Sequence, residues 1–172
     1  MTDSRNAPTI RPATPDDRDA LGRMGAALLH QHHDSDPARF LHVESPEAGY
    51  GRFLVAQITD PRRVVLVAEV SGDVVGYVFG EIADTDWMQL RGPCGIVQDV
   101  FVEPRARGLG AGRALLEAAI AWMHARGRDQ VVLMTKTRNE AAQRLFASLG
   151  FRPTMVEMTR DGADPVGRGT PA

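Results

Sequence analysis

The sequence predicts a mixed α/β fold, of the α+β kind, in which a mixed sheet is flanked by helices. Two runs rich in β-branched residues, 64–70 and 74–82, are joined by a Ser-Gly-Asp turn, which indicates a hairpin. Further along, a strand at 95–102, a helix at 112–126 and a strand at 131–135 form a strand-helix-strand unit. Hairpins pair strands antiparallel and a helical crossover joins parallel strands, so the sheet must contain both kinds of pairing.

The N-terminal part is expected to form one short strand and two helices. Residues 9–11 suit the strand. The first helix begins at residues 14–17, where a threonine can cap, a proline suits the first helical position and an aspartate lies at the capping-box position. Apolar side chains at helical spacing continue to about His32. A second helix begins at residues 45–47 by the same logic and is stopped by Asp60-Pro61.

The C-terminal part adds two helices and a last strand. The crossover helix has one apolar side and is stopped by Gly127. A threonine-to-glutamate capping box at 137–140 opens another helix, which ends at Leu149-Gly150. Residues 151–159 are expected to form the last strand, and the end rich in Gly and Pro, 161–172, is expected to be mobile.

Length and composition limit the class of protein. The 172 residues suit one domain, which we place at residues 1–160. A formal net charge of −2 argues against non-specific nucleic-acid binding, which needs a strong basic field. Cys94 is the only cysteine, so no intrachain disulfide can form, and this fits a reducing compartment. A polar N-terminus and the lack of an apolar run of ~20 residues predict a cytoplasmic protein without a signal peptide or a membrane span.

The most informative segment is a glycine-rich turn between a strand and a helix. The strand ends at Val102, three glycines alternate at Gly108, Gly110 and Gly112, and a helix follows. Glycine lets the backbone approach a ligand closely, and a helix start presents unpaired N–H groups with a partial positive charge. Together they predict a cradle for phosphate oxygens. A plain tight turn with solvated arginines is the alternative, and the arginines concerned are Arg105, Arg107 and Arg113.

Two common phosphate-binding motifs are absent from this turn. It contains no Gly-Lys-Ser/Thr, which excludes a P-loop. The dinucleotide fingerprint needs a third small residue, and the spacing places Arg113 or Leu115 at that position. The next strand is followed by Lys136 rather than by the acid that would hold a ribose.

Two motifs carry a resemblance to a known family. The run Arg107-Gly108-Leu109-Gly110-Ala111-Gly112 matches R/Q-x-x-G-x-G/A, and residues 139–151 resemble N-x-x-A-x-x-x-Y-x-x-x-G-F. In this order they are motifs of the GCN5-related N-acetyltransferase (GNAT) superfamily. Residues 10–17 also resemble the family's first strand and helix, so the similarity covers residues 9–159.

The resemblance implies a GNAT fold: a mostly antiparallel sheet of six to seven strands, about four helices, and one parallel strand pair that splays apart. Acetyl-CoA would lie between the splayed strands, 95–102 and 131–135, and no metal is implied. Backbone amides from residues 108–113 would hold its diphosphate. The implied cofactor-binding residues are Val100, Phe101, Val102, Arg107, Gly108, Leu109, Gly110, Ala111, Gly112, Arg113, Asn139 and Phe146.

The family's chemistry implies direct transfer of an acetyl group from acetyl-CoA to a primary amine. An amine with a lysine-like pKa of ~10.4 is mostly protonated, so a base or a water chain must remove a proton. Several relatives carry a glutamate where this chain has Gln98. The candidate bases are therefore Asp99, if a bulge re-aims it, and Glu81. Phe146 replaces the tyrosine that usually protonates the departing thiolate, so another acid, a water or unassisted departure must serve.

The acceptor amine stays open at this stage. By resemblance, residues 29–49 and 84–95 build the substrate side. Their His and Asp residues match no established metal-site spacing, which favours a polar helix end or an acidic rim for a cationic amine. A small amine leads, with a protein N-terminus or lysine as an alternative. Phe146 and Gln98 motivate a third reading, a catalytically impaired acyl-CoA-binding module. Homodimers are frequent in such families, which allows one here by analogy.

Overall fold

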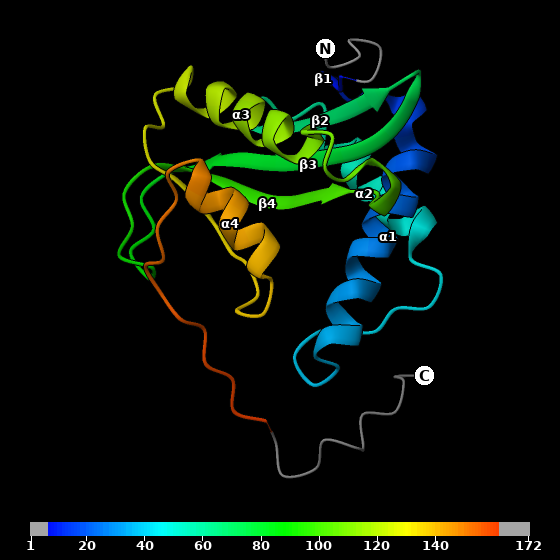
Figure 1. Ribbon diagram of the computed structural model, residues 1–172. Coiled ribbons are helices and arrows are strands. Elements are labelled where there is room, and N and C mark those ends of the chain that lie inside the picture. Colours follow the sequence, from blue (N-terminus) through cyan, green and yellow to red (C-terminus); the bar gives the residue numbers. More distant parts are fainter. Residues whose placement is uncertain (1–6, 162–172) are drawn as a thin grey trace.

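The computed structural model describes residues 7–161 and contains one mixed sheet with helices on both sides (Figure 1). Within the described residues the sheet has five strands, in the order β1-β2-β3-β4-β5. The strands are β1 (Thr9–Pro12), β2 (Arg63–Val70), β3 (Asp73–Ala83), β4 (Cys94–Val102) and β5 (Val131–Leu133). The helices are α1 (Arg18–Ser35), α2 (Glu47–Gln57), α3 (Ala111–His124) and α4 (Glu140–Ser148), with 3₁₀ turns η2 (Pro15–Asp17) and η3 (Pro104–Ala106).

The strand pairing confirms the predicted mixed sheet. Neighbours from β1 to β4 are antiparallel, and the expected hairpin is β2–β3. The parallel pair β4–β5 is short: it runs from Gly95 opposite Val131 to Val97 opposite Leu133. β4 itself continues to Val102. β4 and β5 are therefore not paired with each other beyond this point, as a strand pair that splays apart requires, while β4 stays paired with β3.

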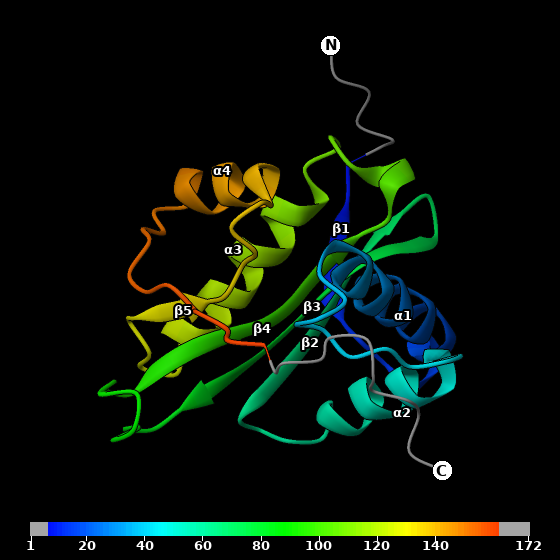
Figure 2. The same cartoon turned by 90° about the horizontal axis from the view of Figure 1, so that it is seen from below.

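The four helices cover the two faces of the sheet in pairs (Figure 2). On one face, α3 and α4 pack against the strands through a buried apolar cluster that includes Val97, Leu115 and Phe146. On the other face, α1 and α2 pack through a second cluster that includes Leu54 and Phe101. Removing this apolar surface from water is what holds the layers together. No helix in residues 7–161 combines the length and the apolar character needed to cross a membrane.

The segment after α4 corrects the prediction of a last strand at 151–159. No strand forms there, and the described sheet has five strands instead of the expected six to seven. Met155 is 80% exposed, and Glu157 pairs with Arg39 from the loop after α1. The segment leaves the sheet, and a backbone without a neighbouring strand cannot build a ladder. The tail predicted to be mobile, 161–172, lies outside the described residues from position 162 onward.

Other element boundaries differ from prediction by a few residues. Helix α1 continues to Ser35 rather than His32, and β5 ends at Leu133. The cap of α4 is Asn139, whose side-chain oxygen accepts a hydrogen bond from the Ala142 amide at 3.3 Å. The cap is therefore Asn139 instead of the threonine at the start of the predicted capping box at 137–140. The side chain of the residue directly before a helix is the one that reaches the free amides of the first helical turn.

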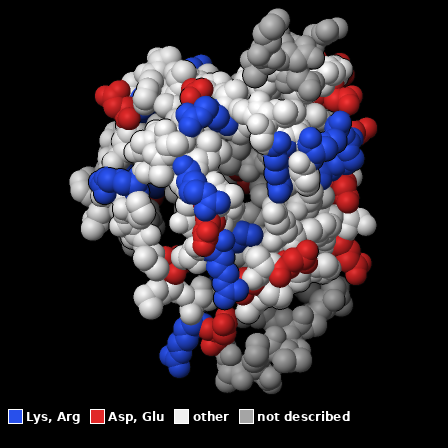
Figure 3. All heavy atoms as spheres, viewed as in Figure 1, with Lys and Arg blue, Asp and Glu red and all other residues white. Residues whose placement is uncertain are grey.

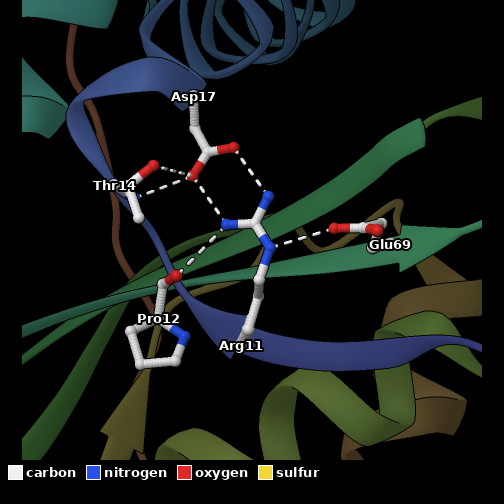
Figure 4. Close-up of polar contacts among 5 residues, drawn as sticks. All are labelled: Arg11, Pro12, Thr14, Asp17 and Glu69. Atoms are coloured by element: carbon white, nitrogen blue, oxygen red, sulfur yellow. Dashed lines mark hydrogen bonds and ion pairs between the residues drawn. The ribbon is translucent and has the colours of Figure 1, made fainter. Parts of the chain in front are cut away.

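Arg11 joins the first strand to the first helix and to the neighbouring strand (Figure 4). Its guanidinium donates two hydrogen bonds to Asp17, at 2.8 and 2.9 Å, and one to Glu69 at 2.9 Å. Asp17 also accepts from the amide and hydroxyl of Thr14. Asp17 is only 6% exposed. These hydrogen bonds, led by those from Arg11, lower the pKa of Asp17.

Replacing Asp17 with asparagine is expected to lower the free energy of unfolding by about 1–3 kcal/mol at pH 7, because Arg11 loses a charged partner. The folded-state pKa of Asp17 lies below its unfolded value, so its contribution is present above pH ~4 and is lost as the pH falls through the folded pKa. Urea unfolding across this range should show the two proteins converging toward acid. Asp73→Asn, at a 68% exposed side chain, is the control and should change little.

Candidate active site

A bulge in β4 places two polar residues beside the α1–α2 face of the sheet. Phe79 of β3 lies opposite Asp99, but the next residue, Gly80, lies opposite Val97, so Gln98 is the extra residue. Val97 packs into the α3 cluster, whereas Gln98 and Asp99 line a pocket with residues from α2 and β3. In a regular strand Val97 and Asp99 would share a face. The bulge proposed from the sequence is therefore present and turns Asp99 toward the pocket.

The pocket is open, with a volume of about 360 Å³. It lies between α2 and the central strands. Aromatic side chains form part of its wall, and charged and amide groups form the rest. The lining residues are Tyr50, Phe53, Arg63, Phe79, Glu81, Gln98 and Asp99.

Asp99 is held by two tyrosines through one of its oxygens. The hydroxyls of Tyr50 and Tyr77 both donate to Oδ2, at 2.6 and 3.2 Å. Burial, and next the charge of Asp99, raise the pKa of both tyrosines above the ordinary value of 10.0, so they stay protonated donors at any working pH. Oδ1 accepts no hydrogen bond from residues 7–161. It is thus available to a ligand in the pocket.

Glu81, the other predicted base, has both oxygens engaged. Gln98 donates from Nε2 to Oε1 at 2.7 Å, and Arg63 Nε lies 3.4 Å from Oε2. The same guanidinium also pairs with Asp60 and contacts Gln57. Glu81 is therefore a carboxylate paired with a cation, unlike Asp99.

Close packing between α1 and α2 sets the position of Tyr50. The ring of Tyr50 lies directly over Gly25 of α1, where an added Cβ would stand 2.1 Å from a ring carbon. Only a glycine fits beneath the ring at that separation. The packing of the two helices thereby aims the Tyr50 hydroxyl at Asp99.

The glycine turn at the start of α3 has the backbone geometry that a phosphate cradle needs. Gly108 and Gly110 have φ angles of 81° and 85°, a left-handed conformation that glycine adopts at no steric cost. The first backbone bond of the helix runs from the Ala114 amide to the Gly110 carbonyl. The amides of residues 108–113 donate no hydrogen bond to any other described residue. These are the unpaired donors that an anion at a helix start requires.

The arginines of this region have distinct partners. Arg105 pairs with Glu103 and Asp73, which reduces its value as an anion ligand. Arg113 pairs with Glu117 and donates to Ser148 of α4 at 2.6 Å. Arg107 has no ion pair within residues 7–161; its Nε donates to the carbonyl of Val102 at 3.1 Å, and this tethers the turn to the end of β4.

The remaining predicted cofactor residues lie around the same strand end. Val100, Phe101 and Val102 belong to the part of β4 that has no β5 partner. Asn139 caps α4, and Phe146 is 7% exposed and packs edge-on against Phe151. Figure 3 shows a hollow over β4, between α4 and α1, with Lys and Arg side chains on both sides. Contact of these residues with a cofactor stays a prediction.

A comparison with protein families decides the assignment. Residues 26–151 match the Acetyltransferase (GNAT) family. The chain belongs to this family. The GNAT chain is also 31% identical over 145 residues to an uncharacterised N-acetyltransferase of Archaeoglobus fulgidus. This alignment covers 83% of this chain and 92% of that protein. Family and relatives together make it an acetyltransferase.

Two further comparisons cover part of the chain or its fold. A mycothiol acetyltransferase of Thermobispora bispora is 41% identical over 93 residues, 54% of this GNAT chain. The chain spans only 31% of the length of that relative. A predicted acetyltransferase of Clostridium acetobutylicum, solved with acetyl-CoA, has a TM-score of 0.67 and 15% identity, with 88% and 96% of the two chains covered. The similarity to this solved structure shows the fold alone. Within residues 7–161 no three His, Cys, Asp or Glu side chains gather as a metal site would need.

Several residues at or behind the pocket of this GNAT enzyme were not singled out from the sequence. Tyr77 and Phe79 alternate along β3 with Glu81, which was predicted, so the three share one face of the sheet, and that period was visible in the sequence. Nothing local marked Tyr50 or Arg63, which reach the pocket from α2 and β2 through tertiary packing.

Replacing Tyr50 with phenylalanine is expected to lower kcat roughly 3- to 10-fold, the equivalent of one net hydrogen bond, because Asp99 loses its shorter anchor. Tyr50 acts through Asp99, so the KM for acetyl-CoA should stay unchanged. Tyr77→Phe removes the longer bond and should cost less. Steady-state kinetics on both variants would refute the positioning role if the acetyl-CoA KM moved while kcat did not.

Proposed function

We propose that the protein is an acetyl-CoA-dependent N-acetyltransferase that moves an acetyl group directly to the primary amine of a small molecule. The observation that carries the proposal is Asp99: one oxygen is anchored by two tyrosines, and the other accepts no hydrogen bond from residues 7–161 in a pocket beside the part of β4 that has no β5 partner. A volume of about 360 Å³ lies in the range of small-ligand sites, roughly 300–1,000 Å³.

The described residues fit the cofactor at the cradle. Six consecutive amides without a described acceptor, two glycines with positive φ and the nearby Arg107 suit a diphosphate. The edge of β4 from Val100 to Val102 that has no β5 partner suits an extended amide-bearing arm, which would pair with it as an added strand. Acetyl-CoA, when bound, supplies the acetyl thioester. Asn139, whose oxygen is occupied as a helix cap, has its amide group left for such a ligand.

Asp99 would perform the proton transfer. An alkylammonium must lose a proton before its nitrogen can attack, and a carboxylate within hydrogen-bond reach can accept it. The contacts of Oδ2 with Tyr50 and Tyr77 support this role for Oδ1, since they hold the opposite oxygen and orient the group. Glu81 is less suited because Arg63 and Gln98 already occupy its oxygens. Phe146 offers no proton to the departing thiolate, and a water or unassisted departure serves instead, since a thiol with a pKa of ~8.5 leaves readily.

The alternatives predict different behaviour. A protein N-terminus or lysine would also present a primary amine, but a pocket of about 360 Å³ has the size of a small-ligand site. A catalytically impaired module would bind acetyl-CoA without turnover. The predicted cytoplasmic location, the single domain at residues 1–160 and a homodimer belong to the same proposal.

Two measurements test the function. Thermal melting with and without acetyl-CoA should show an increase in Tm at saturating ligand. Release of free thiol should then appear with a panel of small amines and be weaker with peptides. No change in Tm would contradict cofactor binding. A rise in Tm without turnover on any amine would favour the impaired module, and faster turnover on peptides would favour a protein substrate.

A further inference from the structure

We propose that the acceptor is a monocationic amine attached to an apolar or aromatic group, and not a polycation such as a polyamine or an aminoglycoside. The inference rests on the proposed function, because it takes the Asp99 pocket as the acceptor site. It follows from two independent features of that pocket, its charge and its wall.

The pocket holds one uncompensated negative charge. Three of its lining residues are charged: Arg63, Glu81 and Asp99. Arg63 neutralises Glu81 at 3.4 Å, and Asp99 has no ion pair within residues 7–161. The carboxylate of Asp99 can therefore balance the charge of a ligand with one ammonium. A second ammonium would have to displace Arg63 from Glu81 or remain unpaired, and both are unfavourable in a partly desolvated site.

The neighbouring acids give no further site for a second ammonium. Asp60, beside the pocket, lies 3.4 Å from the same Arg63, so Asp60, Glu81 and Arg63 together carry one net negative charge. Asp84, at the end of the strand that carries Glu81, pairs with both Arg62 and Arg128, at 3.0 and 3.1 Å, so these three residues carry one net positive charge that offsets it. The predicted acidic rim is thus largely neutralised by arginines on this side of the molecule.

Part of the pocket wall is aromatic. Phe53 and Phe79 meet edge to face with centroids 5.8 Å apart, and Tyr50 contacts Phe53 in the same way at 6.2 Å. Phe79 is 5% exposed, whereas Phe53 is 48% exposed, so Phe53 still has apolar surface to cover. An apolar group next to the amine would bury that surface. A hydroxylated sugar or a strongly hydrated second ammonium would bury less apolar surface there.

The test compares amines by equilibrium binding and by turnover, with acetyl-CoA replaced by CoA for binding. Phenethylamine should bind the wild-type protein at least tenfold more tightly than spermidine or kanamycin, with methylamine weaker than phenethylamine. Phe53→Ala should weaken phenethylamine about tenfold and leave methylamine unchanged, so methylamine is the internal control for folding. Arg63→Gln should free Glu81 and shift preference several-fold toward a diamine such as putrescine.

The outcomes separate this inference from the proposed function. Tighter binding of spermidine or kanamycin than of phenethylamine, or no measurable binding of any amine, would overturn the monocation inference. Phenethylamine binding without turnover would leave the inference standing and refute catalysis. Failure of acetyl-CoA to raise the Tm would refute the cofactor proposal, while the order of amine affinities would still decide the acceptor class.

Discussion

Asp99→Asn is expected to lower kcat by about 10²–10⁴-fold, the typical contribution of a positioned general base. Asparagine keeps nearly the same shape and can still accept hydrogen bonds from Tyr50 and Tyr77, so the pocket should hold its form. It cannot take a proton from an ammonium. Thiol release under saturating acetyl-CoA and amine measures the loss, and the Kd for acetyl-CoA should stay within twofold of wild type.

Glu81→Gln is the matched control for this prediction. The residue lines the same pocket and the substitution also removes one negative charge, but its carboxylate is already shared by Gln98 and Arg63. We expect a kcat loss of less than tenfold. A larger loss in Glu81→Gln than in Asp99→Asn would transfer the role of base to Glu81. Wild-type turnover in both variants would point to a water chain.

The sequence predicted those parts of the fold that local chemistry determines. The Ser-Gly-Asp turn joins β2 and β3. The predicted cap at Thr14 opens the 3₁₀ turn η2, which leads directly into α1, and Thr14 donates hydrogen bonds to Asp17. The failure lies at 151–159, where the composition suits a strand but a strand also needs a neighbour. Glu157 is instead drawn to Arg39, 118 residues away in sequence, and no local pattern reports such a contact.

In the candidate site, too, some features could be predicted from local sequence and others depend on tertiary contacts. The cradle could be predicted because a strand, glycines and a helix start are contiguous in the chain. Asp99 and Glu81 could both be named as candidate bases, but the contacts that distinguish them come from other elements: two tyrosines for Asp99, and Arg63 for Glu81. The register shift opposite Gly80 likewise depends on the pairing of two strands. Tertiary contacts therefore decide which carboxylate is free.

Gly110→Val is expected to weaken acetyl-CoA binding about 10- to 100-fold. Gly110 has φ 85° directly before α3, and a β-branched residue disfavours this left-handed conformation by more than the roughly 1–2 kcal/mol typical of L-residues. Relaxing to negative φ would turn the amides of the cradle away from a common centre. The new side chain would also stand where nothing now lies within 4 Å of the glycine, in the space that a diphosphate would need. Calorimetric titration with acetyl-CoA measures the change.

Gly127→Val separates binding from stability, because it makes the same substitution at the other end of the same helix. Gly127 has φ 71° and, like Gly110, no atom within 4 Å of an added Cβ, but it follows the last turn of α3. Both variants should lose stability to a similar degree, whereas only Gly110→Val should lose affinity for acetyl-CoA. Equal affinities in the two variants would mean that the cradle does not hold the diphosphate, since the two sites differ in little except their place along the helix.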